Sequence, residues 1–294
     1  MPRIAITLGA SFLGYATHAG FLAGLHERGV RPVAVAGSSA GAIAAGLFAA
    51  GLSQERIKAE VLRHALRLSF VRRTRWLWHQ LSRLGFSRQP SVFHSEGAVQ
   101  HLESIVGNRR IEDLHSPRLT IAMTDLTNHQ AHFAQKGPLA RAMAVSCCVP
   151  VMFSPIEFEG RLYHDGGVVH ELPMDFWFED DDVDWIIAHR IDHPPAPRAR
   201  LFPSNVIALS GSAHDAVCLQ LLHYREQLAA KAGKKLLVVN TIHPRPPMLF
   251  GQGLGAFYEQ GYRAAQEWHD KTLRPLLDAE AATSMIRASS HHAS

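Results

Sequence analysis

Residues 31–50 read RPVAVAGSSAGAIAAGLFAA, and this stretch decides the fold. Residues 31–36 are a short apolar run of the kind found in a buried strand, and residues 41–50 are a run of small residues that predicts a helix. Only a tight turn of glycine, serine and alanine separates the two runs. A strand that passes directly into a helix through such a turn is typical of an α/β protein.

The residues before this stretch repeat the pattern. Ile4–Leu8 predicts a short buried strand, a glycine-punctuated loop covers residues 9–14, and an apolar helix extends through about Arg28. Two such units in succession predict the opening of a doubly wound parallel sheet. The two loops should then lie side by side at the carboxyl edge of the strands, where these folds place their sites.

The same alternation continues along the chain. Residues 53–110 read as helical, further strands are expected at 119–125, 184–190 and 235–240, and further helices at 137–145, 212–232 and 255–279. We expect one domain over residues 1–282 and a small, polar, disordered tail over residues 283–294.

Composition favours a globular protein of a reducing compartment. The 294 residues are 47% hydrophobic, and no 18-residue window is apolar and free of charge, so a membrane would be contacted only from outside. The short apolar run at the N-terminus lacks the length and cleavage site of a signal peptide. Three cysteines, with Cys147 and Cys148 adjacent, suit inert buried thiols and a cytoplasmic location. A net charge of +4 is too small to indicate nucleic-acid binding by itself.

The turn at residues 37–41 spells G-x-S-x-G, the pattern of a nucleophile elbow. The central serine, Ser39, would occupy strained backbone at the apex, flanked by Gly37 and Gly41, whose missing Cβ atoms avoid clashes. The N-terminus of the following helix would stabilise developing negative charge. We therefore predict Ser39, and not Ser38, as a nucleophile; the alternative is a tight turn with an ordinary N-capping serine.

A serine hydroxyl needs a base, and the best candidate is Asp165. Nineteen histidines make the choice of any one of them unsafe, whereas Asp165 precedes Gly166 and Gly167, which let backbone approach closely. An aspartate at its ordinary pKa is a weak base at neutral pH, so it would need burial and direct contact with the hydroxyl. The alternative for Asp-Gly-Gly is a β-turn.

Four motifs follow one another between about residues 4 and 192. They are the early glycine loop with Gly9 and Gly14, GSSAGAIAAGLFAAG, AVSCCVPVMFSP at 144–155, and DGG at 165–167. In this order they resemble the patatin-like phospholipase family. The resemblance implies a three-layer α/β/α sandwich with a mostly parallel central sheet. It also implies lipid acyl hydrolysis by a Ser39–Asp165 dyad without histidine, metal or organic cofactor.

Two segments depart from the family pattern. The first loop is normally G-G-G-x-R/K-G, and this chain has GASFLG at 9–14, which lacks two central glycines and the basic residue. The resemblance implies that this loop supplies an oxyanion hole, and we expect the backbone amides of Ala10, Ser11 and Ala40 to be its donors. After DGG, the chain has Glu171-Leu172-Pro173 where the family often has Asn before x-Pro.

Residues 61–95 contain no acidic side chain. Their arginines are interleaved with phenylalanine and tryptophan, a pattern that fits a helix lying on an anionic membrane. The alternatives are a helix packed on the core with solvated arginines, or a phosphate-binding surface for nucleic acid, which we do not expect.

Two other functional hypotheses stay open from the sequence. A catalytically weak lipid-binding or regulatory protein on the same fold would explain the altered first loop. An ordinary α/β-hydrolase would use a late histidine such as His243, although its nucleophile usually follows more strands than the two found here. The sequence leaves the exact lipid and the oligomeric state open.

Overall fold

The computed structural model describes residues 2–70, 95–150, 152–194, 206–244 and 253–291. Its centre is a single sheet with the strand order β5-β6-β3-β2-β1-β7-β8, to which β4 is added beside β3. The strands are β1 (Ile4–Leu8), β2 (Ala34–Ser38), β3 (Arg118–Asp125), β4 (Gln130–Ala134), β5 (Ile156–Phe158), β6 (Arg161–Asp165), β7 (Trp185–Asp192) and β8 (Lys235–Ile242). The pairs β1–β2, β2–β3, β1–β7 and β7–β8 are parallel, whereas β3–β4, β3–β6 and β5–β6 are antiparallel.

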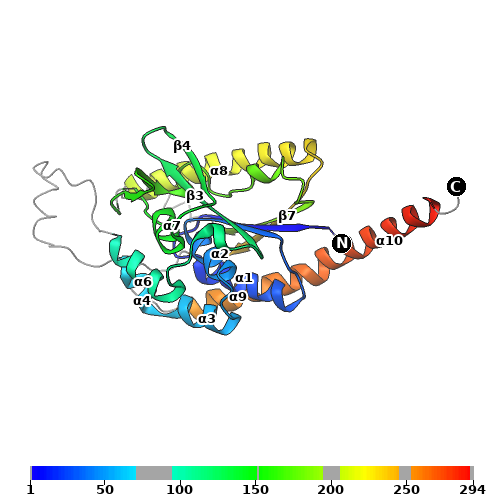
Figure 1. Cartoon of the computed structure of the whole chain (residues 1–294), viewed down its shortest axis with the longest axis horizontal. Coiled ribbons are helices and arrows are strands. Elements are labelled where there is room, and N and C mark those ends of the chain that lie inside the picture. The colour runs from blue at the N-terminus through cyan, green and yellow to red at the C-terminus, as the bar shows by residue number, and fades with distance from the viewer. Residues whose placement is uncertain (1, 71–94, 151, 195–205, 245–252, 292–294) are drawn as a thin grey trace, which may run out of the picture.

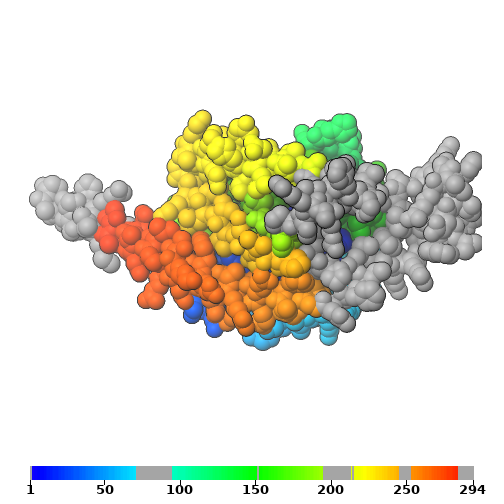
Figure 2. Space-filling model, turned by 180° about the vertical axis from the view of Figure 1, so that it is seen from behind, coloured from blue at the N-terminus to red at the C-terminus, as the bar shows by residue number. Residues whose placement is uncertain are grey.

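Helices cover both faces of this sheet. They are α1 (Tyr15–Glu27), α2 (Ala40–Ala49), α3 (Gln54–Leu62), α4 (His64–Phe70), α6 (Glu96–Val106), α7 (Leu139–Ser146), α8 (Val206–Lys231), α9 (Leu254–Trp268) and α10 (Arg274–His291), with a π-helical turn (His269–Leu273) between the last two. Figure 1 shows α8 on one side of the sheet and α1, α2 and α9 on the other. Seen from behind, α8 and α9 cover opposite halves of the molecule (Figure 2). The predicted three-layer α/β/α sandwich with a mostly parallel sheet is confirmed.

The side chains of the central strands alternate between two apolar cores. In β1, Ile4, Ile6 and Leu8 face the large core formed with α1, α2 and α9, and Ala5 faces the smaller core beside α8. Because both faces are covered, the side chains of β1, β2 and β7 are almost all buried, and most of them are apolar. This burial explains why these strands stand out in the sequence as short apolar runs.

Helices α1 and α9 pack with their backbones almost in contact. A Cβ added to Gly20 of α1 would lie 2.0 Å from the carbonyl oxygen of Tyr258, and one added to Gly261 of α9 would lie 2.1 Å from that of Thr17. Only glycine permits this approach, so the two helices fix the position of β1 and its following loop from behind.

The predicted parallel strands are confirmed, but β4, β5 and β6 were not predicted. They are short and antiparallel, and β4 is half exposed, so they lack the long apolar runs of the central strands. Between β5 and β6, Glu159 and Gly160 both adopt positive φ, which is typical of a two-residue hairpin turn.

Predictions for the helical regions have mixed outcomes. Helices α3, α4 and α6 lie within the predicted 53–110 region, and residues 71–94, which carry most of the basic segment, lie outside the described residues. The predicted disordered tail from 283 differs from the structure, because α10 continues to His291 and projects from the body (Figure 1). From Thr283 to His291 the sequence contains neither glycine nor proline, so no helix-breaking residue ends α10 earlier. Among the described helices, none has the length and apolarity needed to cross a membrane.

Candidate active site

Ser39 stands at the apex of the turn between β2 and α2. Its backbone angles are φ 52° and ψ −122°, a conformation that non-glycine residues rarely adopt. A Cβ on Gly37 would lie 2.3 Å from the Gly41 carbonyl oxygen, and a Cβ on Gly41 would lie 2.2 Å from that of Leu8. The glycines are therefore required by close backbone contacts, and the turn has the geometry of a nucleophile elbow.

Asp165 reaches Ser39 from the end of β6. Strand β6 pairs with β3, which pairs with β2, so the carboxyl end of β6 lies beside the elbow although 126 residues separate the two side chains in sequence. The Ser39 hydroxyl donates a 2.7 Å hydrogen bond to Asp165 Oδ2. The other carboxylate oxygen, Oδ1, accepts a 2.7 Å bond from the backbone N–H of Gly167. The glycine after the aspartate thus orients the carboxylate.

Burial changes the proton affinity of this carboxylate. Asp165 is only 4% exposed, and desolvation raises its pKa to about 7, against the lowering effects of the hydrogen bonds from Ser39 and Gly167. A carboxylate with such a pKa is a much stronger base than an exposed aspartate. The structure therefore meets both requirements that the sequence set for Asp165, which are burial and direct contact with the hydroxyl.

Two residues of the 144–155 segment, Ser146 and Cys147, form hydrogen bonds with the backbone of Ser39. The Ser39 backbone N–H donates to Ser146 Oγ at 2.9 Å, and Ser146 donates in turn to the Ala122 carbonyl of β3 at 2.7 Å. The Cys147 thiol donates to the Ser39 carbonyl oxygen at 3.1 Å. This segment belongs to the motif AVSCCVPVMFSP, but no role for Ser146 was predicted. A buried serine at the end of an apolar helix is too common to indicate such a role from sequence.

The first loop lies against both the elbow and DGG. A Cβ on Gly167 would lie 2.6 Å from Ala10 Cβ, so the loop and the Asp165 turn touch. The Ala10 N–H, however, donates to the Glu171 carbonyl oxygen at 2.8 Å, so this amide is not free for an oxyanion, and Ala10 is removed from the predicted donors. Within the described residues, no acceptor is found for the amides of Ser11 and Ala40. The amides of Ser11 and Ala40 therefore remain as the predicted oxyanion donors.

A buried histidine pair holds the base of the first loop. Gly9 donates its N–H to the His189 carbonyl oxygen at 3.0 Å, and the ring of His189 contacts His18 Nδ1-to-Nδ1 at 2.9 Å. Burial lowers the pKa of His18 to about 3, so this ring is neutral at ordinary pH. His189 also bonds Thr241 through Nε2 at 2.9 Å. The sequence offered no way to choose these two among nineteen histidines.

The other candidate groups lie outside this arrangement. His243 bonds Thr17 through Nε2 at 2.9 Å and the Pro244 carbonyl through Nδ1 at 2.8 Å, so both of its ring nitrogens are engaged away from Ser39. The predicted burial of the thiols holds for Cys148 and Cys218, whose pKa burial raises to about 12. In the described part of the chain, no three His, Cys, Asp or Glu side chains are grouped as metal ligands would be.

Sequence relatives match the part of the chain that contains these residues. An uncharacterized NTE family protein of Mycobacterium tuberculosis is 37% identical over 177 residues, which cover 59% of this chain and 45% of that protein. The protein YqhO of Bacillus subtilis is 32% identical over 172 residues, covering 51% and 58% of the two chains. Patatin-like phospholipase domain-containing protein 7 of mouse is 30% identical over 178 residues, covering 58% of this chain and 12% of that protein. The chain thus spans less than two thirds of these relatives.

A solved structure of similar fold and a family pattern also match this chain. The crystal structure of VipD from Legionella pneumophila superposes with a TM-score of 0.50 at 14% identity, covering 92% of this chain and 67% of that one. The pattern of the family described as patatin-like phospholipase matches residues 8–176, more than half of the chain and a range that includes both Ser39 and Asp165. The chain therefore belongs to the patatin-like phospholipase family.

Proposed function

We propose that this protein is a serine hydrolase of lipid acyl esters, of the phospholipase A or lysophospholipase type. The observation that carries the proposal is the 2.7 Å hydrogen bond from Ser39 on a strained elbow to the buried carboxylate of Asp165. Membership of the patatin-like phospholipase family supports a lipid ester as the substrate class.

The proposed reaction is a two-step acyl transfer through Ser39. Asp165 takes the hydroxyl proton as the Ser39 oxygen attacks the ester carbonyl, and the amides of Ser11 and Ala40 hold the oxyanion that forms. Collapse of this intermediate breaks the ester bond, and the leaving alcohol receives the proton from Asp165. Asp165 then removes a proton from water, whose oxygen attacks the acyl-enzyme. As the acyl bond to Ser39 breaks and the fatty acid leaves, Asp165 returns this proton to the Ser39 oxygen.

Replacement of Ser39 tests the proposal. Ser39→Ala should reduce turnover of p-nitrophenyl acyl esters by about a thousandfold or more, because the nucleophile is lost. Ser104→Ala is the matched control, since Ser104 is exposed on α6 and its hydroxyl donates only locally, to the His101 carbonyl oxygen. A fluorophosphonate should label wild type at the peptide containing Ser39. A Ser39→Ala variant as active as wild type would refute the proposal.

A second candidate is a catalytically weak lipid-binding or regulatory protein. It is favoured by the altered first loop and by the engagement of the Ala10 amide with Glu171. This candidate predicts retained binding of lipid vesicles together with no turnover and no labelling of Ser39. Labelling of Ser39 with measurable hydrolysis would exclude it.

Peripheral membrane contact through residues 61–95 is a separate part of the proposal. It rests on the sequence of the segment, which has arginine and aromatic residues and no acidic ones. Co-sedimentation should recover more protein with vesicles that contain anionic lipid than with neutral vesicles. Equal recovery in the supernatant for both vesicle types would remove this part and leave the proposed hydrolysis intact.

A further inference from the structure

The turn that carries Asp165 is closed by His170. Gly166–Val168 form a single 3₁₀ turn directly after Asp165, and the backbone N–H of His170 donates to the Gly166 carbonyl oxygen at 2.9 Å. The Gly167 N–H that holds Asp165 Oδ1 lies inside this turn. The position of His170 therefore affects the hydrogen bond that orients the carboxylate of Asp165.

The side chain of His170 is buried and held in place. Only 4% of the residue is exposed, and the Phe133 ring of β4 packs against it in a T-shaped arrangement, with ring centroids 5.0 Å apart. Its Nε2 lies 2.8 Å from Asp175 Oδ2. Within the described residues Nδ1 has no hydrogen-bond partner, so the contact with Asp175 is what orients the ring.

Asp175 is held in turn by an arginine of α8. Arg225 Nε donates to Asp175 Oδ1 at 3.0 Å, and only 8% of the Arg225 side chain is exposed. Burial acts to raise the pKa of Asp175, but the hydrogen bond from His170 and the charge of Arg225 outweigh it, so the pKa lies below its ordinary value. An ionised carboxylate only accepts hydrogen bonds, so His170 carries its proton on Nε2 and donates it to Asp175.

The residue after His170 contacts the other half of the site. The Glu171 carbonyl oxygen accepts the 2.8 Å bond from the Ala10 N–H of the first loop. His170 thus lies between the Asp165 turn and the first loop, and its side chain ties both to α8. Its ring bonds to Asp175 and not to Ser39 or Asp165, so it would act on the dyad through the backbone of the turn.

We infer that His170, held by Asp175 and Arg225, is a positioning residue for Asp165 in the proposed hydrolysis. While this contact is intact, the Gly167 N–H stays on Asp165 Oδ1 and stabilises the ionised carboxylate. Loss of the contact loosens the turn, weakens this bond and raises the affinity of Asp165 for a proton. The effect on rate rests on the proposed function, whereas the effect on Asp165 itself is measured without turnover.

The other titratable groups that interact with Asp165 are thiols at the end of α7. Burial raises the pKa of Cys147 well above its ordinary value and that of Cys148 to about 12. Both thiols are therefore uncharged near neutral pH. A change in the titration of Asp165 in this range would report on the burial and hydrogen bonds of its own carboxylate.

Titration of the Asp165 carboxyl by ¹³C NMR on the full chain tests the inference, with the signal assigned by its absence in Asp165→Asn. His170→Leu keeps an apolar side chain of similar size but breaks the bond to Asp175. The midpoint for Asp165 should then move upward by about one pH unit, a tenfold gain in proton affinity. His170→Gln, whose amide can donate from the position of Nε2, should stay near the wild-type midpoint.

The rate of ester hydrolysis should change in a matching way. In His170→Leu, kcat for a p-nitrophenyl ester should fall about fivefold at pH 7 and recover at pH 9, with little change in KM, because only ionised Asp165 accepts the Ser39 proton. A general loss of structure would lower the rate equally at both pH values. Absence of hydrolysis by wild type would refute the proposed function, and the NMR titration would still decide the role of His170.

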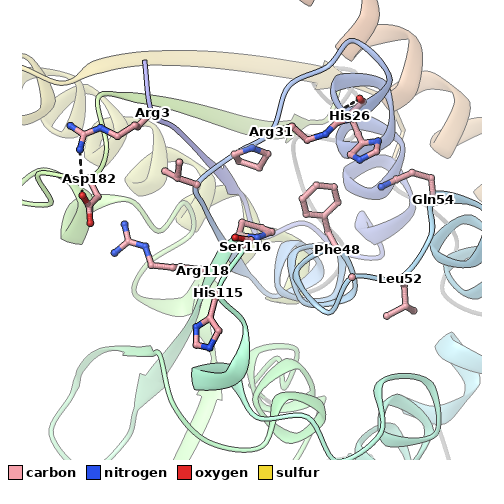
Figure 3. A pocket seen from close by; sticks show the side chains of 14 residues that line it. Arg3, His26, Arg31, Phe48, Leu52, Gln54, His115, Ser116, Arg118 and Asp182 are labelled. Atoms are coloured by element: carbon pink, nitrogen blue, oxygen red, sulfur yellow. Dashed lines mark hydrogen bonds and ion pairs between the residues drawn. The ribbon is translucent and has the colours of Figure 1, made fainter. Parts of the chain in front are cut away.

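Asp180→Asn is the matched control. Asp180 also pairs with an arginine, Arg118, at 2.9 Å. Arg118 begins β3 and lines a cavity of about 620 Å³ at the amino edge of the sheet, the opposite end of the strands from Ser39; Figure 3 shows it there near Arg3 and Asp182. This variant should titrate Asp165 and hydrolyse esters as wild type does.

Three results would overturn the inference. They are an unchanged Asp165 midpoint in folded His170→Leu, an equal shift in Asp180→Asn, and a shift in His170→Gln as large as in His170→Leu. Should His170→Leu not fold, Asp175→Asn decides, because the Asp175 side chain is 39% exposed and the substitution keeps its shape. It weakens both bonds of the carboxylate and should move the Asp165 midpoint upward; an unchanged midpoint would overturn the inference equally.

Discussion

Asp165 combines two properties that rarely occur together in an aspartate, a direct hydrogen bond to a serine hydroxyl and nearly complete burial. Burial raises its pKa to about 7, while its hydrogen bonds with Ser39 and Gly167 act in the opposite direction. The charged form is therefore available near neutral pH yet retains a strong affinity for protons. The same shift affects both the reaction rate and the stability of the fold.

The rate of ester hydrolysis should rise with pH around neutrality. Only the ionised Asp165 accepts the Ser39 proton, so kcat/KM for a p-nitrophenyl ester should increase as pH passes through about 7 and then level off. The measurement is the initial rate between pH 5 and 9, from which the rate of Ser39→Ala at the same pH is subtracted. A profile with its rising limb near pH 4 would contradict the assignment of the base.

The free energy of unfolding should fall as pH rises, whereas the rate of hydrolysis increases. The folded-state pKa of Asp165, about 7, lies above its ordinary value of 3.8, so its stabilising effect is fully present below about pH 4 and is lost as pH rises through 7. Asp165→Asn removes the buried charge. The stability of this variant relative to wild type should therefore be higher at pH 8 than at pH 4. We expect a relative gain on the order of a few kcal/mol. Urea unfolding of both proteins at the two pH values would measure it, and an equal difference at both would contradict it.

At the scale of elements, the contact between α1 and α9 sets the position of the first loop. Gly20 and Gly261 let the two helix backbones approach, and α1 begins directly after the loop that faces Ser39. His18, on the same helix, contacts the His189 ring beneath that loop. A change in helix packing should therefore reach the site through the loop.

Substitution of Gly20 tests this coupling. Gly20→Ala places a Cβ 2.0 Å from the Tyr258 carbonyl oxygen, so it should destabilise the fold by about 1–3 kcal/mol or more. It should also lower activity in the molecules that remain folded. Chemical denaturation and ester hydrolysis are the measurements.

Gly255→Ala is the control for Gly20→Ala. Gly255 also lies in a helix, but a Cβ there meets nothing within 4 Å, so this change should be neutral or slightly stabilising. Equal destabilisation by the two variants would show that the effect does not come from the α1–α9 contact.

At the scale of the whole molecule, the C-terminal helix separates into a packed part and a projecting part. Leu273 is fully buried, whereas the described side chains from Asp278 to Thr283 are exposed and α10 extends away from the body (Figure 1). Helical structure in the projecting part therefore arises from local propensity more than from contacts with the core.

Deletion of residues 283–294 should leave the fold almost unchanged. We expect a change in unfolding free energy within about 0.5 kcal/mol, because the described side chains that lead into this segment, from Asp278 to Thr283, are exposed. Leu273→Ala, by contrast, should cost about 2–5 kcal/mol by leaving a cavity. Thermal denaturation of both proteins distinguishes these outcomes, and a large loss on deletion would show that α10 packs on something essential.

The linear pattern was sufficient to predict the parallel half of the sheet and the tight turn that carries Ser39. Strands β1, β2, β3 and β7 lie inside the sheet and are mostly buried, so they appear as apolar runs, and β8 contains such a run although it is a partly exposed edge strand. The turn at 37–41 needs glycines that are visible in the sequence. The sequence also pointed to Asp165, through the two glycines that follow that residue and through the order of the motifs. These features are local, so a linear pattern can record them.

Which groups come into contact depends on the tertiary structure. The antiparallel strand β6 carries Asp165 to Ser39, Ser146 supports the elbow from α7, and Glu171 occupies the Ala10 amide that had been expected to bind an oxyanion. Each of these contacts joins residues more than 100 positions apart and depends on strand order and on backbone hydrogen bonding. Neither residue type nor spacing encodes the contacts of Ser146 and Glu171, because any buried donor pairs with whichever acceptor the fold brings near.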